Sequence, residues 1–446
     1  MINVLVFPCS SGIGQEIYNA LKYHKDITLY GTNSSNVNTG SILYGSSYIE
    51  NAPPMSKTED CINWLNNIIK AYNIDCIFPA YDDANVWLKT NEIFLSNIKI
   101  ITSSIETVLI CRSKKVTYDK FKCIIRCPKV YSSIESVSSE YPIFIKPECG
   151  EGSKGCHVIY SEDSLKNTIT NDHIIIEYLP GVEYTVDCFS DIFGNLLFVG
   201  PRVRSATRSG ISVITETFID VDNEFCDIAH KINCNLKCIG AWFFQVKRSI
   251  DNELCLMEIA PRVSGAMFLY RQQGINFPLL SVYTHMGLSI NIIPPKLDYV
   301  VGCKIYTNNF YIPQFIKDPI VAFYIDLDDT LTLSGQNKAN PNVISLLYES
   351  KLANIPIYLI TRHKGVVEET LDILYINKNI FNKIIHITDK TEKTDYIINR
   401  PAILLDDSYS ERYKCDNNIY VFDIDSLEIV RDIIKMSYSR FLITHE

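Results

Sequence analysis

The sequence lacks the basic stretches that bind nucleic acid. Its 51 Asp and Glu residues outnumber its 42 Lys and Arg residues, the formal net charge is −9 at pH 7, and no run is rich in Lys or Arg. Because phosphate backbones are bound through a basic face, nucleic acid is not an expected partner. Small anionic ligands are still compatible with this charge, since they need only a local pocket.

Long hydrophobic runs and clustered cysteines are also absent. No segment approaches the roughly 18 consecutive apolar residues of a membrane span, so a membrane partner is not expected. The 15 Cys residues are scattered, and the CxxxC pairs Cys123/Cys127 and Cys234/Cys238 have no second cluster, which argues against structural zinc. The odd number of Cys and the start MINVLVFPCSS, which does not resemble a signal peptide, favour reduced thiols and a cytoplasmic location.

The length of 446 residues, with 47% hydrophobic and 21% charged residues, suggests about three globular domains of the α/β and α+β classes. Apolar strands alternate with amphipathic helices over residues 1–105, which predicts a parallel α/β domain. Residues 106–310 contain β-rich runs separated by turn residues, typical of largely antiparallel sheets. A proline-punctuated linker near 292–320 precedes a second strand–helix alternation over 320–446.

The loop SSGIG at residues 10–14 follows the first strand and opens a helix. It is compatible with phosphate binding at a helix N-terminus or with a simple tight turn, because a full GxGxxG pattern is absent.

A second glycine-rich loop follows Lys146 in IKPECGEGSKG. Glycines allow backbone amides to approach phosphate oxygens, and a lysine at the base of the loop adds a positive charge. Downstream, the strand HIIIE leads into Tyr178 and Leu179 before a Pro-Gly turn. Each feature alone also fits a purely structural hairpin.

The segment FFQVKRSIDNELCLMEIAPRV predicts two strands joined by a turn. This arrangement brings Gln245 and Glu258 within reach of each other, and their oxygens suit Mg²⁺. Arg262 can donate charge-assisted hydrogen bonds to a phosphate, although an ion pair with Glu258 is the structural alternative.

In this order the elements resemble the ATP-grasp superfamily, in particular carboxylate-amine ligases similar to carbamoyl phosphate synthetase, over roughly residues 1–310. The resemblance implies a pre-ATP-grasp domain before an ATP-grasp domain, with ATP and Mg²⁺ as cofactors and Mn²⁺ as a substitute. It implies Gln245 and Glu258 as metal ligands and Arg262 as a phosphate-contacting residue. The family's usual motif is Glu-Ile-Asn-Pro-Arg, whereas this chain reads EIAPR, with Ala260 in place of the Asn. This difference leaves open how a second metal would be bound. The implied ATP contacts are Lys114, Lys146, Gly152, Ser153, Gly155, Glu177, Tyr178, Leu179 and Glu183.

Three arginines stand close together in VGPRVRSATRSGIS: Arg202, Arg204 and Arg208. Alternation along a strand puts Arg202 and Arg204 on one face, where they could bind a substrate carboxylate or form a solvated edge.

The stretch FYIDLDDTLT places Asp326 and Asp328 at the end of an apolar strand. Like charges this close repel unless a cation lies among them, and the carboxyl ends of parallel strands are where α/β sheets bind ligands. Later strands end in the polar residues Thr361, Asp406 and Asp407, and two lysines, Lys390 and Lys393, lie between these strands in the sequence.

This order resembles the haloacid dehalogenase superfamily of phosphotransferases over about residues 320–446, with a Rossmann-like fold. The resemblance implies Asp326 as nucleophile, Asp328 as acid and base, and Mg²⁺ held by Asp326, Asp328 and Asp406. Thr361 and Lys393 would contact the phosphoryl group, with Lys390 as the alternative lysine. Only 34 residues separate Asp326 from Thr361, which leaves little or no room for a cap domain.

The leading hypothesis is a bifunctional enzyme, an amide-forming ligase fused to a phosphatase of the same pathway. Its partners would be a small carboxylate, an amine and a phosphate ester, with self-association left open. The alternatives are a phosphatase with a non-catalytic ATP-binding domain and a nucleotide-sensing regulatory protein.

Overall fold

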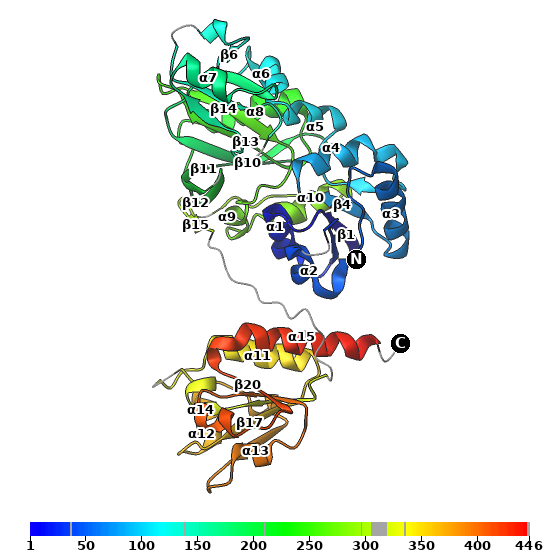
Figure 1. Cartoon of the computed structure of the whole chain (residues 1–446), viewed down its shortest axis with the longest axis vertical. Coiled ribbons are helices and arrows are strands. Elements are labelled where there is room, and N and C mark those ends of the chain that lie inside the picture. Colours follow the sequence, from blue (N-terminus) through cyan, green and yellow to red (C-terminus); the bar gives the residue numbers. More distant parts are fainter. Residues whose placement is uncertain are drawn as a thin grey trace. The chain divides into compact units, whose positions relative to one another are not determined.

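The computed structural model describes residues 1–35, 38–137, 140–150, 152–208, 210–295, 297–304, 319–333 and 336–443. It divides into two compact units, Met1–Ile305 and Tyr306–Glu446, and each unit is described by itself (Figure 1). Part of the expected linker near 292–320 lies outside the described residues. The expected boundary near residue 105 falls inside the first unit, because the α/β domain and the antiparallel domain pack into one body.

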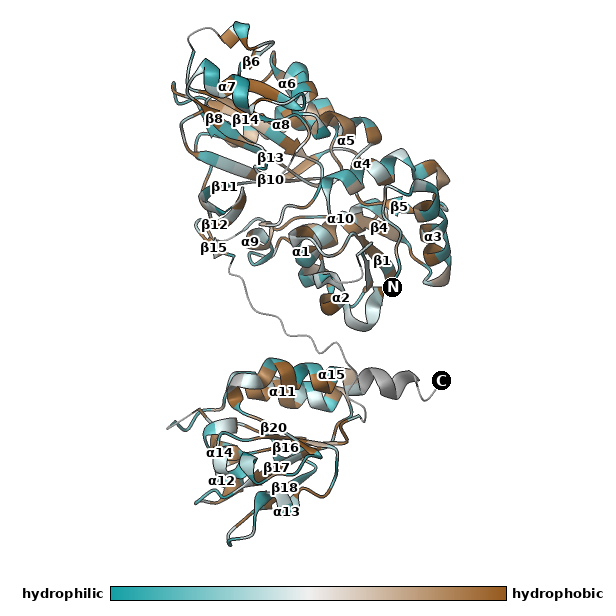
Figure 2. Ribbon diagram, in the orientation of Figure 1, coloured by the Kyte–Doolittle hydropathy of each residue, from teal (hydrophilic) through white to brown (hydrophobic). Residues whose placement is uncertain are grey.

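The first unit begins with a five-stranded parallel sheet in the order β3-β2-β1-β4-β5. The strand order reverses between β1 and β4, and ligands of open α/β sheets bind beyond the carboxyl ends of such strands. Both strands are made mostly of hydrophobic residues (Figure 2). The strands are β1 (Ile2–Phe7), β2 (Ile27–Thr32), β3 (Tyr48–Ile49), β4 (Cys76–Pro79) and β5 (Lys99–Ile100), and the helices are α1 (Gly12–Leu21), α2 (Thr39–Tyr44), α3 (Thr58–Ala71) and α4 (Asp82–Thr90).

The SSGIG loop forms a tight turn that starts α1. Ser11 caps the helix by accepting a hydrogen bond from the Gly14 amide at 3.0 Å, and its hydroxyl donates to the Ala80 carbonyl at 2.7 Å. A Cβ atom on Gly14 would lie 2.2 Å from the Cys9 carbonyl oxygen, so only glycine fits there. The turn therefore fixes the start of α1 beside the end of β4.

The rest of the first unit is built on antiparallel sheets, as the sequence predicts. A six-stranded sheet has the order β14-β13-β10-β11-β12-β15, and a four-stranded sheet has the order β6-β9-β7-β8. The strands are β6 (Val130–Tyr131), β7 (Ile143–Pro147), β8 (His157–Ile159), β9 (His173–Glu177), β10 (Glu183–Ser190), β11 (Leu196–Arg208), β12 (Ile211–Thr217), β13 (Gly240–Arg248), β14 (Leu254–Ala260) and β15 (Val301–Cys303). The helices are α5 (Ile105–Arg112), α6 (Lys114–Phe121), α7 (Glu162–Thr168), α8 (Glu224–Leu236), α9 (Phe268–Arg271) and α10 (Phe277–His285).

The core of this part lies between the six-stranded sheet and α8. Trp242 and Phe244 on β13 are fully buried together with Ile232 of the helix. The Trp242 indole donates a hydrogen bond to the Ser190 hydroxyl at 2.9 Å, so its polar edge is satisfied inside the core. This packing holds β10 and β13 rigid, and both strands carry residues of the site.

The second unit is a five-stranded parallel sheet in the order β18-β17-β16-β19-β20. The alternation of strands and helices predicted over 320–446 is confirmed, and the helix expected from about Pro341 begins at that residue. The strands are β16 (Ala322–Ile325), β17 (Ile357–Thr361), β18 (Lys383–His386), β19 (Ala402–Leu405) and β20 (Ile419–Phe422), and the helices are α11 (Pro341–Leu352), α12 (Val367–Ile373), α13 (Lys393–Tyr396), α14 (Tyr409–Tyr413) and α15 (Leu427–Ile443).

Two helices lie side by side on one face of this sheet (Figure 1). They are α11 and α15, and Arg431 joins them through an ion pair with Glu349 at 2.8 Å. Among the described residues, no helix combines the length and the apolar character needed to cross a membrane.

Candidate active sites

A cavity of about 560 Å³ lies in the first unit. One wall comes from the parallel sheet, where Ser11, Gly12 and Asp82 follow β1 and β4. The opposite wall comes from β13 and β14 of the antiparallel sheet. The cavity therefore lies where the topology of the parallel sheet places ligands.

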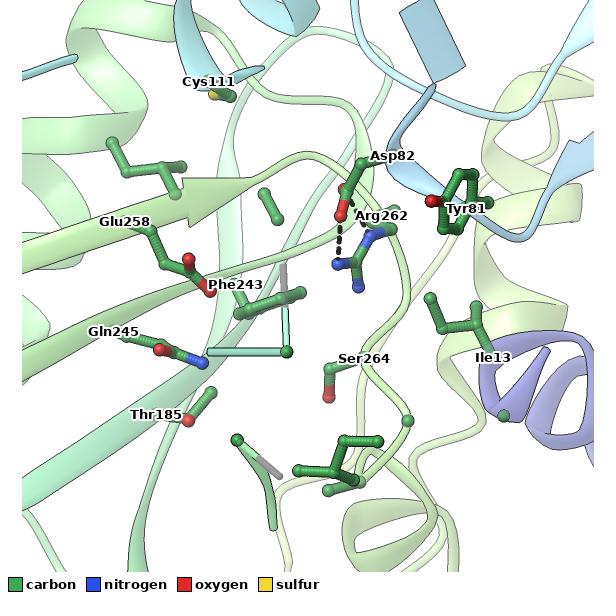
Figure 3. A pocket seen from close by; sticks show the side chains of 18 of the residues that line it. Ile13, Tyr81, Asp82, Cys111, Thr185, Phe243, Gln245, Glu258, Arg262 and Ser264 are labelled. Atoms are coloured by element: carbon green, nitrogen blue, oxygen red, sulfur yellow. Dashed lines mark hydrogen bonds and ion pairs between the residues drawn. The ribbon is translucent and has the colours of Figure 1, made fainter. Parts of the chain in front are cut away.

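Gln245 and Glu258 project into this cavity from neighbouring strands (Figure 3). They are direct partners in the antiparallel register of β13 and β14, so their side chains lie on the same face. An amide oxygen beside a carboxylate is a donor set that suits Mg²⁺. Ala260, two residues after Glu258 on the same strand, also lines the cavity and offers no ligand atom.

Two lysines lie near these ligands. Lys114, at the start of α6, lines the cavity, and its ammonium group donates to the Gly150 carbonyl at 2.9 Å. Lys146, near the end of β7, is buried and donates to the Tyr118 hydroxyl at 2.6 Å. Burial, with a smaller contribution from Lys114, lowers the pKa of Lys146 to about 8, although Glu258 opposes the shift. Positive charge held by neutral acceptors is suited to receive an anion such as a phosphate.

The glycine-rich loop lies against the tip of the β11–β12 hairpin. Gly152 and Lys154 line the cavity, and a Cβ atom on Gly210 would lie 2.4 Å from the Ser153 hydroxyl oxygen. Gly155 accepts a hydrogen bond from His173 through its carbonyl at 2.8 Å. The loop is thus placed next to the lysines, although of the predicted loop contacts only Gly152 is among the described residues that line the cavity.

Four of the ATP contacts that the resemblance implies, Glu177, Tyr178, Leu179 and Glu183, are held by contacts within the protein or lie outside the described lining of the cavity. Glu177 accepts hydrogen bonds from the Arg126 guanidinium at 2.8 Å and from the Lys129 amide at 3.0 Å, and Leu179 is buried. Glu183 is ion-paired with Arg204. The described lining of the cavity does not include Glu177, Tyr178, Leu179 or Glu183, so their roles remain predictions.

The arginine cluster is engaged within the protein. Arg202 and Arg204 both line the cavity, but Arg202 forms a buried ion pair with Asp187 at 2.7 Å and also donates to the Ser264 hydroxyl at 3.2 Å. Arg204 donates to the Gly210 carbonyl as well as to Glu183. Arg208 is exposed. The pairing with Asp187 counts against the predicted binding of a substrate anion by Arg202, because its charge is already neutralised.

Arg262 links the two walls of the cavity. Its guanidinium makes a two-pronged ion pair with Asp82 of α4, with N···O distances of 2.5 and 2.6 Å (Figure 3). It also lies 5.1 Å from the centre of the Phe243 ring. Contact with a phosphate was predicted for Arg262, whereas the structure gives it a carboxylate partner from a residue 180 positions away.

The second unit brings its acidic residues together at the ends of two strands. Ile325 and Leu405 are partners in the parallel pair β16–β19, so Asp326 and Asp406, which follow them, lie side by side. One carboxylate oxygen from each of Asp326, Asp406 and Asp407 lies within 4.8 Å of the others. This spacing and chemistry fit a hard divalent cation.

A buried lysine lies between these carboxylates. The Lys393 ammonium group contacts Asp326 at 2.7 Å and Asp406 at 2.6 Å, whereas Lys390 is exposed. Burial raises the pKa of Asp326 to about 7, with Lys393 opposing the shift and Asp406 adding to it. The single positive charge of Lys393 therefore does not balance the carboxylates of Asp326, Asp406 and Asp407.

Asp328 is set apart from this cluster. Its side chain is 51% exposed and accepts a hydrogen bond from His363 Nδ1 at 2.8 Å. The other ring nitrogen of His363 lies 2.8 Å from the Thr370 hydroxyl, so the imidazole is held at both ends. Thr361 is buried and accepts from the His363 amide at 3.1 Å. His363 was missed in the sequence, although its place two residues after Thr361 is a usable signal.

The antiparallel sheets and the glycine-rich loop form an ATP-grasp-like fold, in which Gln245 and Glu258 are placed side by side. Residues 170–302 match the family model described as ATP-grasp in the biosynthetic pathway with Ter operon. That match includes Gln245, Glu258 and Arg262.

Solved structures with this fold support the assignment. A complex of biotin carboxylase with β,γ-ATP from Campylobacter jejuni is 16% identical with a TM-score of 0.54, over 65% of this chain and 72% of that one. N5-carboxyaminoimidazole ribonucleotide synthetase from Thermotoga maritima is 17% identical with a TM-score of 0.52, over 68% of this chain and 80% of that one. N5-carboxyaminoimidazole synthetase from Staphylococcus aureus, complexed with ADP, is 14% identical with a TM-score of 0.53, over 65% of this chain and 78% of that one. At these identities the similarity establishes a shared fold.

The buried ion pair yields a stability prediction. Arg202→Met leaves the Asp187 carboxylate buried without its partner, so the free energy of unfolding should fall by about 3–5 kcal/mol. The double variant Asp187→Leu/Arg202→Met removes both charges and should be more stable than the single variant. Urea unfolding of the three proteins checks this. An Arg202→Met protein with unchanged stability would show that the pair does not hold the sheet together.

The lowered pKa of Lys146 yields a second prediction. Near pH 8 the free protein carries Lys146 only partly protonated, and a bound triphosphate should raise its pKa. ATP binding should therefore take up protons at about pH 8 to 9. Calorimetry in buffers of different ionisation enthalpy measures this uptake. Lys146→Arg, which stays charged, should bind ATP without this proton uptake. An equal uptake in the variant would show that Lys146 is not the group that takes up the proton.

Proposed function

We propose that the chain is a bifunctional enzyme, in which the first unit joins a carboxylate to an amine at the expense of ATP and the second hydrolyses a phosphate ester of the same pathway. One observation carries the first half: Gln245 and Glu258 share a cavity with Lys114 and lie near the buried Lys146. Side-chain oxygens beside ammonium groups that hydrogen-bond to neutral acceptors fit a metal-bound triphosphate, and the ATP-grasp-like fold supports this proposal.

The ligase chemistry follows from the charges in the cavity. A carboxylate is a poor electrophile, so its oxygen first attacks the γ-phosphate of ATP to give an acyl phosphate and ADP. The amine then attacks the acyl carbon and releases phosphate. Lys114 and Lys146 offset the repulsion between the two anions, and the walls of the cavity limit hydrolysis by excluding water. Mg²⁺ held by Gln245 and Glu258 would lower this charge further.

The second half of the proposal is a phosphatase similar to the haloacid dehalogenases. It is supported by the strand order β18-β17-β16-β19-β20 and by the polar groups that meet at the strand ends. Asp326 attacks phosphorus while Asp328 donates a proton to the leaving oxygen. Asp328 then takes a proton from water, which attacks the aspartyl phosphate and releases inorganic phosphate.

The remaining polar groups support these steps. Lys393, in contact with Asp326, would offset the charge of the phosphoryl group, and it is the better candidate because Lys390 is exposed. His363 orients Asp328 at the edge of the site. Mg²⁺ held by Asp326 and Asp406, with Asp407 nearby, would neutralise the surplus carboxylate charge.

A second candidate keeps the phosphatase and makes the first unit a non-catalytic ATP-binding domain. Two observations favour it: Ala260 offers no metal ligand, and Arg262 is already ion-paired with Asp82. The two candidates differ in whether ADP is released over many turnovers, which a screen of carboxylates and amines on the intact chain measures.

Separate sites predict separable losses of activity. Glu258→Gln removes a charge from the cavity of the first unit, so ADP release should fall below detection while hydrolysis of p-nitrophenyl phosphate continues. Glu253→Gln, on the exposed turn before β14, is the matched control and should retain both activities. Equal loss of both activities in a folded Glu258→Gln protein would contradict the proposal.

The acid role of Asp328 predicts a dependence on the leaving group. Asp328→Asn should slow hydrolysis of alkyl phosphates by about 10²- to 10⁴-fold, and hydrolysis of p-nitrophenyl phosphate much less, because p-nitrophenolate leaves without a proton. Asp326→Asn should abolish both. Asp329→Asn is the control, since Asn tolerates the positive φ of 55° at this exposed position. An equal loss with both esters in Asp328→Asn would rule out proton donation.

A further inference from the structure

Within the part of the chain that the structure describes, Asn85 is a buried polar side chain of the cavity wall without a hydrogen-bond partner. Asn85 of α4 is only 2% exposed, and neither its amide nitrogen nor its amide oxygen has a hydrogen-bond partner among the described residues. It lines the cavity. An unsatisfied buried donor or acceptor costs about 1–3 kcal/mol. A group that stays in place at this cost points to a ligand that can both accept and donate.

Thr185 on β10 repeats this feature on the other wall. Its hydroxyl is buried, lines the same cavity and has no partner within the described part of the chain (Figure 3). Unsatisfied groups therefore lie on both walls, and Thr185 is the register partner of Gln245 on the neighbouring strand.

Positive charge collects at the side formed by α1. The first turn of this ten-residue helix, at Gly12 and Ile13, lines the cavity, and the unpaired amides of a helix N-terminus attract anions. The Lys304 ammonium group lies 3.2 Å from the point that a Cβ atom on Gly12 would occupy. Glu16 is the nearby carboxylate, but it is ion-paired with Arg271 at 2.8 Å. A lysine beside a positive helix end is favourable only when an anion joins it.

We infer that this side of the cavity is a subsite for the second substrate, a small amine that carries an anionic group, either a carboxylate or a phosphate monoester. The anion lies against Lys304 and the α1 N-terminus, and a polar group of the same molecule pairs with the Asn85 amide. The inference rests on the proposed ligase function for the role of this molecule as the attacking amine. It assigns recognition of the anion to Lys304 in place of the ion-paired Arg202.

The test uses the full chain and three small amines: O-phosphoethanolamine, β-alanine, and ethanolamine, which lacks an anionic group. Binding is measured without nucleotide by saturation-transfer NMR, and ATP binding is measured separately by calorimetry. At least one anionic amine should bind and ethanolamine should not. The two anionic amines distinguish a phosphate subsite from a carboxylate subsite.

A variant of Lys304 and a matched control test the recognition of the anion. Lys304→Met should weaken binding of the anionic amine by about tenfold or more while ATP binding is unchanged. Lys231→Met, a matched loss of charge on the exposed face of α8, should change neither. Binding that depends on Lys304 in a chain that does not bind ATP would preserve the subsite and refute the ligase. ATP binding together with amine binding that does not depend on Lys304 would refute the subsite alone.

Asn85 is tested by stability as well as by binding. Asn85→Leu removes an unsatisfied amide of similar size, so the thermal midpoint should stay equal or rise while binding of the anionic amine weakens. If an internal water satisfied the Asn85 amide instead, Asn85→Leu should lower the thermal midpoint and leave binding of the anionic amine unchanged. A destabilised Asn85→Leu protein with unchanged binding would overturn the role of Asn85.

Discussion

The ion pair between Asp82 and Arg262 is the contact on which the cavity of the first unit depends. It joins α4 of the parallel sheet to the segment that follows β14 of the antiparallel sheet, so it fixes the distance between the two walls. The pair lies within the lining of the cavity, where removal of either partner would leave a partly buried charge. The wall that carries Gln245 and Glu258 and the wall that carries Asn85 are thereby held in one geometry.

Charge imbalance distinguishes the two sites. In the first unit, Lys114 and Lys146 hydrogen-bond to carbonyl and phenol oxygens, so the site favours an incoming anion. In the second unit, Lys393 faces Asp326 and Asp406 with a third carboxylate nearby, so the site favours an incoming cation. The charged groups of both sites are largely buried, and burial increases the effect of a charge imbalance on their pKa values.

Features fixed by neighbouring strands could be predicted from the sequence. Gln245 and Glu258 belong to one hairpin, so strand pattern brought this pair together. Asp326 and Asp406 each end an apolar run, and the resemblance to the haloacid dehalogenases implied that they meet. Contacts between distant elements could not be predicted in this way. The partners of Arg262 and Arg202 are carboxylates on other elements, and nothing in a single sequence ranks one Asp above another as a partner.

The close approach of Gly210 to Gly152 and Ser153 limits how the glycine-rich loop can move. The two backbones leave no room for a side chain at Gly210, so any other residue there would push the glycine-rich loop away from the β11–β12 hairpin. Arg204, which donates to the Gly210 carbonyl and is ion-paired with Glu183, joins the tip of this hairpin to β10. Because Arg204 anchors the hairpin tip to β10, a movement that opens the contact at Gly210 would fall to the glycine-rich loop.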